Sequence, residues 1–234
     1  MLILAIDTAL EACSAAVLDT ETARLCAREQ QPMARGHAEA LMPLIGRVMT
    51  SAGLTFFALD RICVTTGPGS FTGLRVGISA ARGLGLAADR PVVGVTTLSA
   101  YAAPLLSEAD SGPIVSVIDA RHDHVYLQAV GGDGAQLIRP TVAPVTDVIA
   151  DAVRWGAPRF VGNAAGIVAG RWLQGEPPPV SVDPRPAPEI AWVAWLGAAA
   201  DPGRSKARPF YLRAPDAKPQ EATAPDQPAS TATP

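Results

Sequence analysis

The sequence is short of cysteine and histidine, and neither residue type is spaced as a metal or disulfide site requires. The three cysteines lack C-x-x-C spacing, which excludes a disulfide framework and a zinc ribbon and predicts free thiols in a reducing cytosol. With three histidines and no G-x-S-x-G elbow, no Ser-His-Asp triad can be assembled either. These residues are Cys13, Cys26, Cys63, His37, His122 and His124.

Positive charge and long apolar segments are also scarce. The chain carries 19 Lys and Arg against 22 Asp and Glu, a net charge of −3, and no basic run. Proteins that hold nucleic acid alone usually show a basic face, so we expect any nucleic-acid contact to be shared with a partner. No apolar run is long enough to span a bilayer, and the N-terminus lacks the basic region of a signal peptide. We therefore expect a cytoplasmic protein with no membrane partner. Its residues are 48% apolar but only 5% aromatic, which predicts a core of Ala, Val, Leu and Ile.

Glycine is concentrated in one stretch, between a predicted strand at 60–66 and a predicted helix at 73–88. A strand, a glycine-rich turn and a helix start together aim backbone N–H groups at an anion. The glycines at 67, 69 and 73 form the pattern G-x-G-x-x-x-G, which is one residue longer than the dinucleotide fingerprint. No Lys follows the last glycine, as it would in a P-loop. A tight turn without a ligand is the alternative, in which Gly69 is the most sensitive position if it holds a positive φ. Arg75 then either pairs with a carboxylate or phosphate or lies in solvent. The loop residues are Gly67, Gly69, Ser70, Thr72, Gly73 and Arg75, with Ser70 or Thr72 as the helix cap.

The order of predicted elements repeats along the chain. An offset of 112 residues, the difference between 7 and 119, places the apolar strand ending in Asp7 on the one ending in Asp119. Two tandem β-β-β-α-β-α units predict an internal duplication and an α/β fold with lobes at 1–107 and 108–213. The first unit has predicted strands at 2–6, 14–18, 25–30 and 60–66 and helices at 38–52 and 73–88, and a further strand at 91–95 and helix at 96–106 follow it. The second has strands at 114–118, 124–130, 135–139 and 158–161 and helices at 145–155 and 163–173.

The last part of the chain has a different composition. After residue 175 it is rich in proline, which predicts an extended connector, followed by an apolar helix at 189–200. Residues 214–234 contain almost no large apolar side chain, and we expect this tail to be disordered.

Several strings of residues resemble one protein family. The string G-P-G-S-F-T-G-L-R resembles the signature of the TsaB (YeaZ) family. Shorter strings fall in the family's order, namely I-L-A-I-D-T at 3–8, V-I-D-A-R at 117–121, V-G-N at 161–163 and P-F-Y-L-R at 209–213. The resemblance implies a small member of the actin-like ATPase, heat-shock ATPase and sugar-kinase superfold. It also implies the non-catalytic partner subunit in bacterial threonylcarbamoyladenosine synthesis on tRNA.

In that superfold, the Asp that follows each first strand faces the phosphates and metal of a nucleotide. Here Asp7 and Thr8 lead into Ala9 where a glycine normally lets phosphate approach, and Asp119 is followed by no glycine-rich turn. We therefore expect a degenerate cleft, with no catalytic residue and no cofactor of the chain's own. The resemblance leaves open a nucleotide at the boundary with a partner.

The catalytic sister family, TsaD, holds its metal partly through an H-x-x-x-H pair on one helix face. In this chain His37 is followed by Leu41 at the second position, so the metal site looks lost. We expect His37 to contact solvent or a backbone carbonyl at the start of its helix. His122 and His124 form either a metal clip or, as we favour, a polar hairpin corner.

By family resemblance the partners are a TsaD-type catalytic subunit and a TsaE-type ATPase, with tRNA reached only through the complex. Alone, the chain is expected to form a homodimer through the surface that would otherwise bind the TsaD-type subunit. The spacing of Gly73, Gly77, Ala81 and Gly85 predicts close approach of another helix, and Glu at position 74 or 78 should give a folded monomer. The interface residues expected are Leu41, Leu44, Ile45, Val48, Leu74, Gly77, Ile78 and Ala81.

Two other functions remain open at this point. One is a stand-alone small-molecule kinase of the same superfold. The weaker one is a glycoprotease-like metallopeptidase, which the incomplete metal and nucleophile sets disfavour.

Overall fold

The computed structural model describes residues 1–108 and 112–213, and the elements repeat in the predicted order. The first unit contains β1 (Leu2–Asp7), β2 (Ala12–Asp19), β3 (Arg24–Pro32), α1 (His37–Ala52), the 3-10 turn η1 (Phe56–Ala58), β4 (Arg61–Gly67), α2 (Phe71–Ala88), β5 (Val92–Thr96) and α3 (Thr97–Leu106). The second contains β6 (Ile114–Asp119), β7 (His124–Val130), β8 (Gln136–Pro144), α4 (Val145–Arg154), β9 (Arg159–Val161), α5 (Ala165–Ala169), β10 (Ser181–Asp183) and α6 (Ile190–Ala199).

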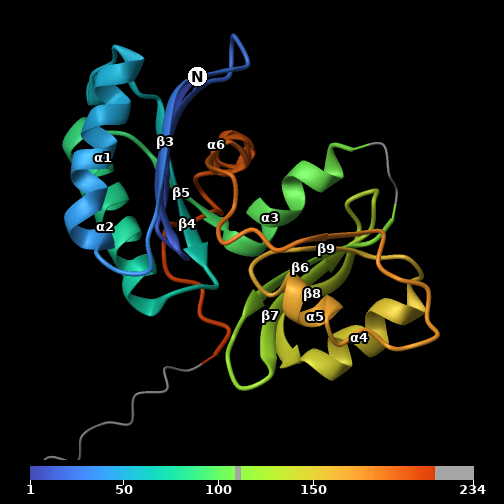
Figure 1. Cartoon of the computed structure of the whole chain (residues 1–234). Helices are drawn as coiled ribbons and strands as arrows, with labels where there is room; N and C mark the ends of the chain where they lie inside the picture. The colour runs from blue at the N-terminus through green and yellow to red at the C-terminus, as the bar shows by residue number, and fades with distance from the viewer. Residues whose placement is uncertain (109–111, 214–234) are drawn as a thin grey trace, which may run out of the picture.

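The strands form two five-stranded sheets with the same topology (Figure 1). The order is β3-β2-β1-β4-β5 in one and β8-β7-β6-β9-β10 in the other. In each sheet the central strand runs antiparallel to the second strand of its unit and parallel to the fourth. This match confirms the predicted duplication and the two-lobed α/β fold.

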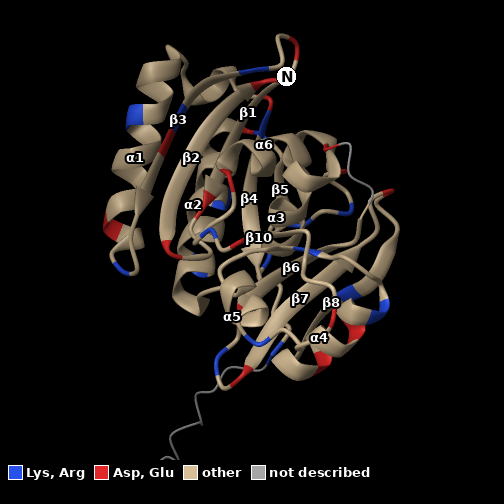
Figure 2. Ribbon diagram, turned by 45° about the vertical axis from the view of Figure 1, so that its right-hand side comes forward, with Lys and Arg blue, Asp and Glu red and all other residues tan. Residues whose placement is uncertain are grey.

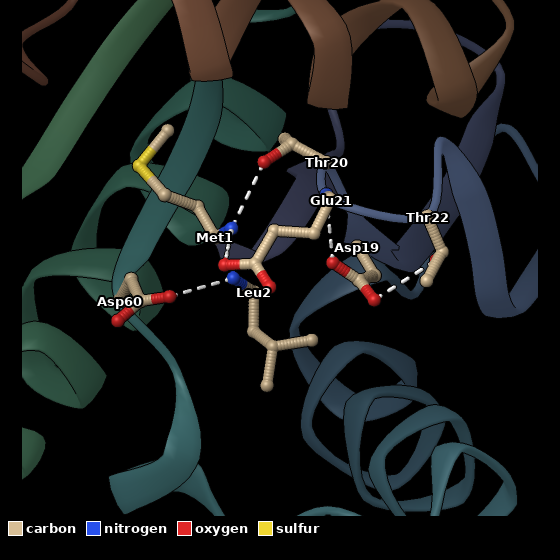
Figure 3. A network of polar contacts seen from close by, with 7 residues as sticks. All are labelled: Met1, Leu2, Asp19, Thr20, Glu21, Thr22 and Asp60. Carbon is tan, nitrogen blue, oxygen red and sulfur yellow. Dashed lines mark hydrogen bonds and ion pairs between the residues drawn. The ribbon is translucent and has the colours of Figure 1, made fainter.

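The polar turn between β2 and β3 lies beside the start of β1 (Figure 3). The Asp19 carboxylate accepts hydrogen bonds from the Glu21 backbone N–H and the Thr22 hydroxyl, both at 2.9 Å. Next to this turn, the Leu2 N–H donates to Asp60 Oδ2 at 2.7 Å. These contacts fix the end of the sheet opposite the glycine-rich loop.

Helices cover both faces of the first sheet. α1 and α2 lie on its outer face, whereas α6 and α3 lie on the face toward the second lobe (Figure 1). The central strand β1 is therefore covered on both sides, which explains its continuous apolar sequence. On the inner face, Ile3 and Ala5 pack with Ile190 and Val193 of α6, a helix that carries no charged residue (Figure 2).

The position of α6 changes the interpretation of the lobes. The range 108–213 expected for the second lobe includes this helix, yet α6 packs on β1, β2 and β4 of the first sheet. The Arg61 guanidinium reinforces the packing by donating to the carbonyls of Gly197, Ala198 and Ala200 at the end of α6. An apolar helix predicts burial, but its sequence does not say against which sheet.

In the second lobe, α4 and α5 cover one face of the sheet and α3 the other. β10 was not predicted, because prolines flank it and the segment was interpreted as an extended connector. The duplication alone would have predicted a fifth strand here, because β10 is the counterpart of β5 in the first sheet. α5 is shorter than the predicted helix at 163–173; it ends at Ala169, and Gly170 is its C-cap.

Within residues 1–108 and 112–213, no helix combines the length and the hydrophobicity that crossing a bilayer would need. The expectation for the tail at 214–234 lies outside the described residues.

Candidate functional site

Asp7, the first candidate cleft residue, is completely buried at the end of β1. Its Oδ1 accepts hydrogen bonds from the Ala9 N–H at 3.0 Å and the Thr65 hydroxyl at 2.5 Å. Its Oδ2 is buried and has no hydrogen-bond partner among the described residues. Burial raises the pKa of Asp7, although the bonds from Thr65 and Ala9 and the nearby His37 act in the opposite direction.

The glycine-rich loop packs against Thr8 and Ala9, the two residues that follow Asp7. The Ser70 N–H donates to the Ala9 carbonyl at 2.7 Å, and the Thr8 hydroxyl donates to the Gly73 carbonyl at 2.7 Å. A Cβ at position 69 would lie 2.3 Å from the Ala9 carbonyl oxygen. In this conformation the loop therefore lies against the Ala9 backbone, at the position where a glycine would let a phosphate approach.

The structure corrects the predicted role of the glycines. Gly69 does not hold a positive φ; that conformation falls on Gly67, with φ of 114°. Gly69 is required instead for close approach to Ala9. Gly73 and Gly77 face Thr8 in the same way, so their spacing serves packing within the chain and not the approach of another helix.

Asp119, the second candidate cleft residue, is exposed at the end of β6. Its carboxylate accepts a hydrogen bond from the Arg121 N–H at 2.8 Å, and its own N–H donates to Asn163 Oδ1 at 2.9 Å. The two equivalent aspartates therefore differ, one sealed in the core and the other open to solvent.

We predict that Asp7 is structural, and substitution separates its charge from its hydrogen bonds. A carboxyl whose pKa is raised by folding destabilises the fold increasingly as pH rises above the ordinary aspartate pKa of about 4. Asp7→Asn keeps the Oδ1 acceptor and removes the charge. The free energy of unfolding of this variant should therefore increase relative to that of the wild type as the pH rises from 4 to 8. Asp7→Ala leaves two buried donors unpaired and should destabilise by about 2 kcal/mol. Urea unfolding across this pH range measures both, and equal effects of the two variants at all pH values would contradict the assignment.

The histidines adopt structural positions. His37 is buried at the start of α1, with Nε2 3.0 Å from the Leu10 carbonyl oxygen, which confirms the expected backbone contact. His122 and His124 lie at the corner between β6 and β7, where Asp123 pairs with Arg171 at 2.8 Å. The polar hairpin corner is thus confirmed. In the described part of the chain, no group of three or more His, Cys, Asp or Glu residues is placed to hold a metal ion.

The cysteines are free, as expected, and two of them are buried. Burial raises the pKa of the Cys13 thiol to about 11 and that of Cys63 to about 12. Both thiols are therefore protonated at neutral pH and are poor nucleophiles.

The remaining loop residues form the start of α2. Ser70 is the N-cap, and its hydroxyl accepts a hydrogen bond from the Gly73 N–H at 3.3 Å. Arg75 is exposed, lies 3.8 Å from the centre of the Phe71 ring and donates to the Tyr211 hydroxyl at 3.3 Å. The Phe71 and Tyr211 rings stack, with centres 5.5 Å apart. Sequence reasoning missed this cluster because its members come from distant strings, although both strings carry the family resemblance.

The expected interface residues are not on the surface. The structure buries all of them in the chain's own core, because each faces the first sheet or the neighbouring helix. They are Leu41, Leu44, Ile45, Val48, Leu74, Gly77, Ile78 and Ala81. Because Leu74 and Ile78 are buried, we expect Leu74→Glu or Ile78→Glu to unfold the chain and not to give the folded monomer predicted from the sequence.

What α1 and α2 do present to solvent is a separate set of residues, which we call the outer α1–α2 face. Met42 is 47% exposed and Leu86 is 86% exposed, and small residues lie between and around them. The face comprises Glu39, Met42, Pro43, Gly46 and Thr50 of α1 and Thr72, Arg75, Ser79, Gly83 and Leu86 of α2.

Comparison with known proteins identifies relatives of the chain. Residues 31–165 match the family model TsaD, described as tRNA N6-adenosine threonylcarbamoyltransferase. Escherichia coli tRNA threonylcarbamoyladenosine biosynthesis protein TsaB is 38% identical over 130 residues, covering 54% of this chain and 53% of that protein. The chain thus spans about half the length of the curated TsaB relatives it matches. An uncharacterized protein of Mycobacterium tuberculosis is 34% identical over 93% of this chain and 94% of its own length. The solved structure of YeaZ from Pseudomonas aeruginosa has a TM-score of 0.72 and 30% identity, covering 90% of this chain and 99% of that one.

Proposed function

The chain belongs to the TsaB (YeaZ) family, and we propose that it acts in tRNA threonylcarbamoyladenosine biosynthesis as a non-catalytic subunit that binds a TsaD-type catalytic subunit. The product would carry threonylcarbamoyl on the N6 amino group of the adenosine next to the anticodon. The chain's own contribution is a binding surface. Its buried Asp7, the glycine-rich loop packed on Ala9 and the protonated thiols offer no reacting group.

The observation that carries this proposal is a pair of glycines on the outer α1–α2 face. Gly46 and Gly83 lie inside helices, where glycine costs about 0.5–1 kcal/mol relative to alanine. A Cβ at either position would meet no atom within 4 Å, so packing within the chain does not require them. Solvent-facing glycines that weaken their own helices are explained if a partner helix approaches closely at these points.

Gly46→Ala should therefore stabilise the isolated chain and weaken the complex. We expect the free energy of unfolding to rise by about 0.5–1 kcal/mol, while the dissociation constant for the catalytic subunit rises severalfold. Chemical unfolding and isothermal titration give the two quantities. Gly166→Ala in α5 is the matched control, because its Cβ would make only an ordinary contact with Pro184 at 3.7 Å. Tighter binding by Gly46→Ala would refute the close approach.

The family resemblance supplies the rest of the assembly. Catalysis belongs to the TsaD-type subunit, a TsaE-type ATPase assists, and tRNA is engaged through the complex in the cytoplasm. A nucleotide would bind at the boundary between subunits. Without its partner, the chain would form a homodimer through the outer α1–α2 face.

Co-purification with the TsaD homologue of the same genome tests the proposal. We expect a stable heteromeric complex in light scattering and a homodimer of the chain alone. Failure of the two proteins to associate would contradict the subunit role.

A stand-alone kinase is the second candidate, and the packing of the glycine-rich loop on Ala9 weighs against it, because phosphate would have to displace that loop. Phosphoryl transfer from ATP to an acceptor by the purified chain alone would favour the kinase.

A further inference from the structure

An open hollow of about 960 Å³ lies at the end of α2, beside the edge strand β5. Four of its lining residues are cationic and one is acidic, although the chain as a whole has a net charge of −3. The cations are Arg82, Arg90, Lys206 and Arg208, and the acid is Asp89.

The backbone fixes two of these cations in place. Residue 206 forms an antiparallel bridge with Val93, and the Gly94 N–H donates to the Ser205 carbonyl at 2.9 Å. A Cβ at position 94 would lie 2.7 Å from the Lys206 carbonyl oxygen, so this glycine allows the close pairing. The Arg208 N–H donates to the Lys206 carbonyl at 2.9 Å, and both side chains are exposed, with Ala207 half-buried between them. Backbone hydrogen bonds thus place these two cations beside the edge of the sheet.

The charges are not neutralised within the described residues. None of the four cations forms an ion pair there, and Asp89 pairs with none of them. Arg90 donates to the Phe57 carbonyl at 2.9 Å, but its Nε is buried with no acceptor in the same part of the chain. The α2 C-terminus adds the negative end of a helix dipole, so the side chains must supply the attraction for an anion.

The lining residues also limit the kind of anion. None of the described residues that line the hollow is aromatic, so they offer a nucleobase no ring on which to stack. A hollow open to solvent and lined by Arg and Lys suits a phosphate backbone, which is bound through charge and not through base edges.

We propose that this hollow binds the phosphodiester backbone of the substrate tRNA, an inference that rests on the proposed function. The hollow borders the outer α1–α2 face at Gly83 and Leu86, so RNA held there would lie beside the catalytic partner. The chain would then add its own electrostatic contact to a complex that holds tRNA jointly.

The test uses the complex of the full chain with its TsaD-type partner and a fluorescently labelled tRNA transcript. Replacing Lys206 and Arg208 together by Ala should raise the dissociation constant roughly tenfold at moderate salt and reduce the salt slope by about two. The control replaces Arg24 and Arg139, two exposed arginines elsewhere, and should leave both quantities unchanged. Thermal unfolding and light scattering verify that both double variants fold and bind the partner.

An affinity and salt slope equal to those of the wild type in an intact complex would overturn the inference while leaving the proposed function in place. Absence of a complex, or of tRNA binding by the wild-type complex, would overturn both. Loss of binding to phosphatidylglycerol vesicles with unchanged tRNA binding would reassign the hollow to a membrane surface and overturn the RNA assignment.

Discussion

Replacing Gly73 by alanine is expected to destabilise the chain by at least about 3 kcal/mol. The new Cβ would lie 2.1 Å from the Thr8 carbonyl oxygen, which is backbone and cannot turn away. The clash separates α2 from the end of β1 and breaks the 2.7 Å bond from the Thr8 hydroxyl to the Gly73 carbonyl. Circular dichroism during urea unfolding measures the loss.

Gly83→Ala is the matched control on the same helix. Position 83 is open to solvent, so the substitution should stabilise the isolated chain by about 0.5–1 kcal/mol. Equal effects of the two substitutions would show that helix propensity, and not contact with Thr8, decides the result.

The second large effect is expected in partner binding. Met42→Glu places a charge on the outer α1–α2 face, where the side chain is already 47% exposed, so the isolated chain should remain folded. In the complex the carboxylate would be buried without a partner, which costs several kcal/mol. We expect the affinity for the catalytic subunit to fall at least 100-fold, about 2.7 kcal/mol, in isothermal titration.

Ile167→Glu provides the comparison, since Ile167 is 41% exposed but lies on α5 in the second lobe. It should bind the partner like the wild type. Equal loss of binding in both variants would point to a general effect of added charge, and normal binding by Met42→Glu would exclude α1 from the interface.

The sequence predicted the fold well wherever periodicity and glycine placement act locally. The apolar strands ending in Asp7 and Asp119 revealed the duplication, and the glycine stretch marked the turn into α2. The short strand at Ser181–Asp183 was not predicted, because the residues around it are rich in proline. The packing of α6 on the first sheet was not predicted either, because it depends on which apolar surfaces the rest of the chain leaves uncovered.

The candidate surface was harder to predict than the fold. An apolar helix face predicts burial, but Ile78 and its neighbours face the chain's own sheet, and no local pattern says whether a covering surface belongs to the same chain. The basic hollow could not be predicted from the sequence for another reason. Arg82 and Arg208 are far apart in sequence, and both line the hollow only because the bridge between residue 206 and β5 brings the later segment there. Exposed glycines such as Gly46 become informative only when the structure shows that nothing within the chain lies opposite them.

The central claim is that the chain supports catalysis by a partner and performs none itself. The most direct measurement is nucleoside mass spectrometry of a tRNA transcript incubated with threonylcarbamoyl-adenylate, the TsaD-type subunit and the TsaE-type ATPase, with and without this chain. We predict threonylcarbamoyladenosine only when this chain and the catalytic subunit are both present, and none when Met42→Glu replaces the wild type. Full modification without this chain, or modification by this chain without the catalytic subunit, would contradict the account.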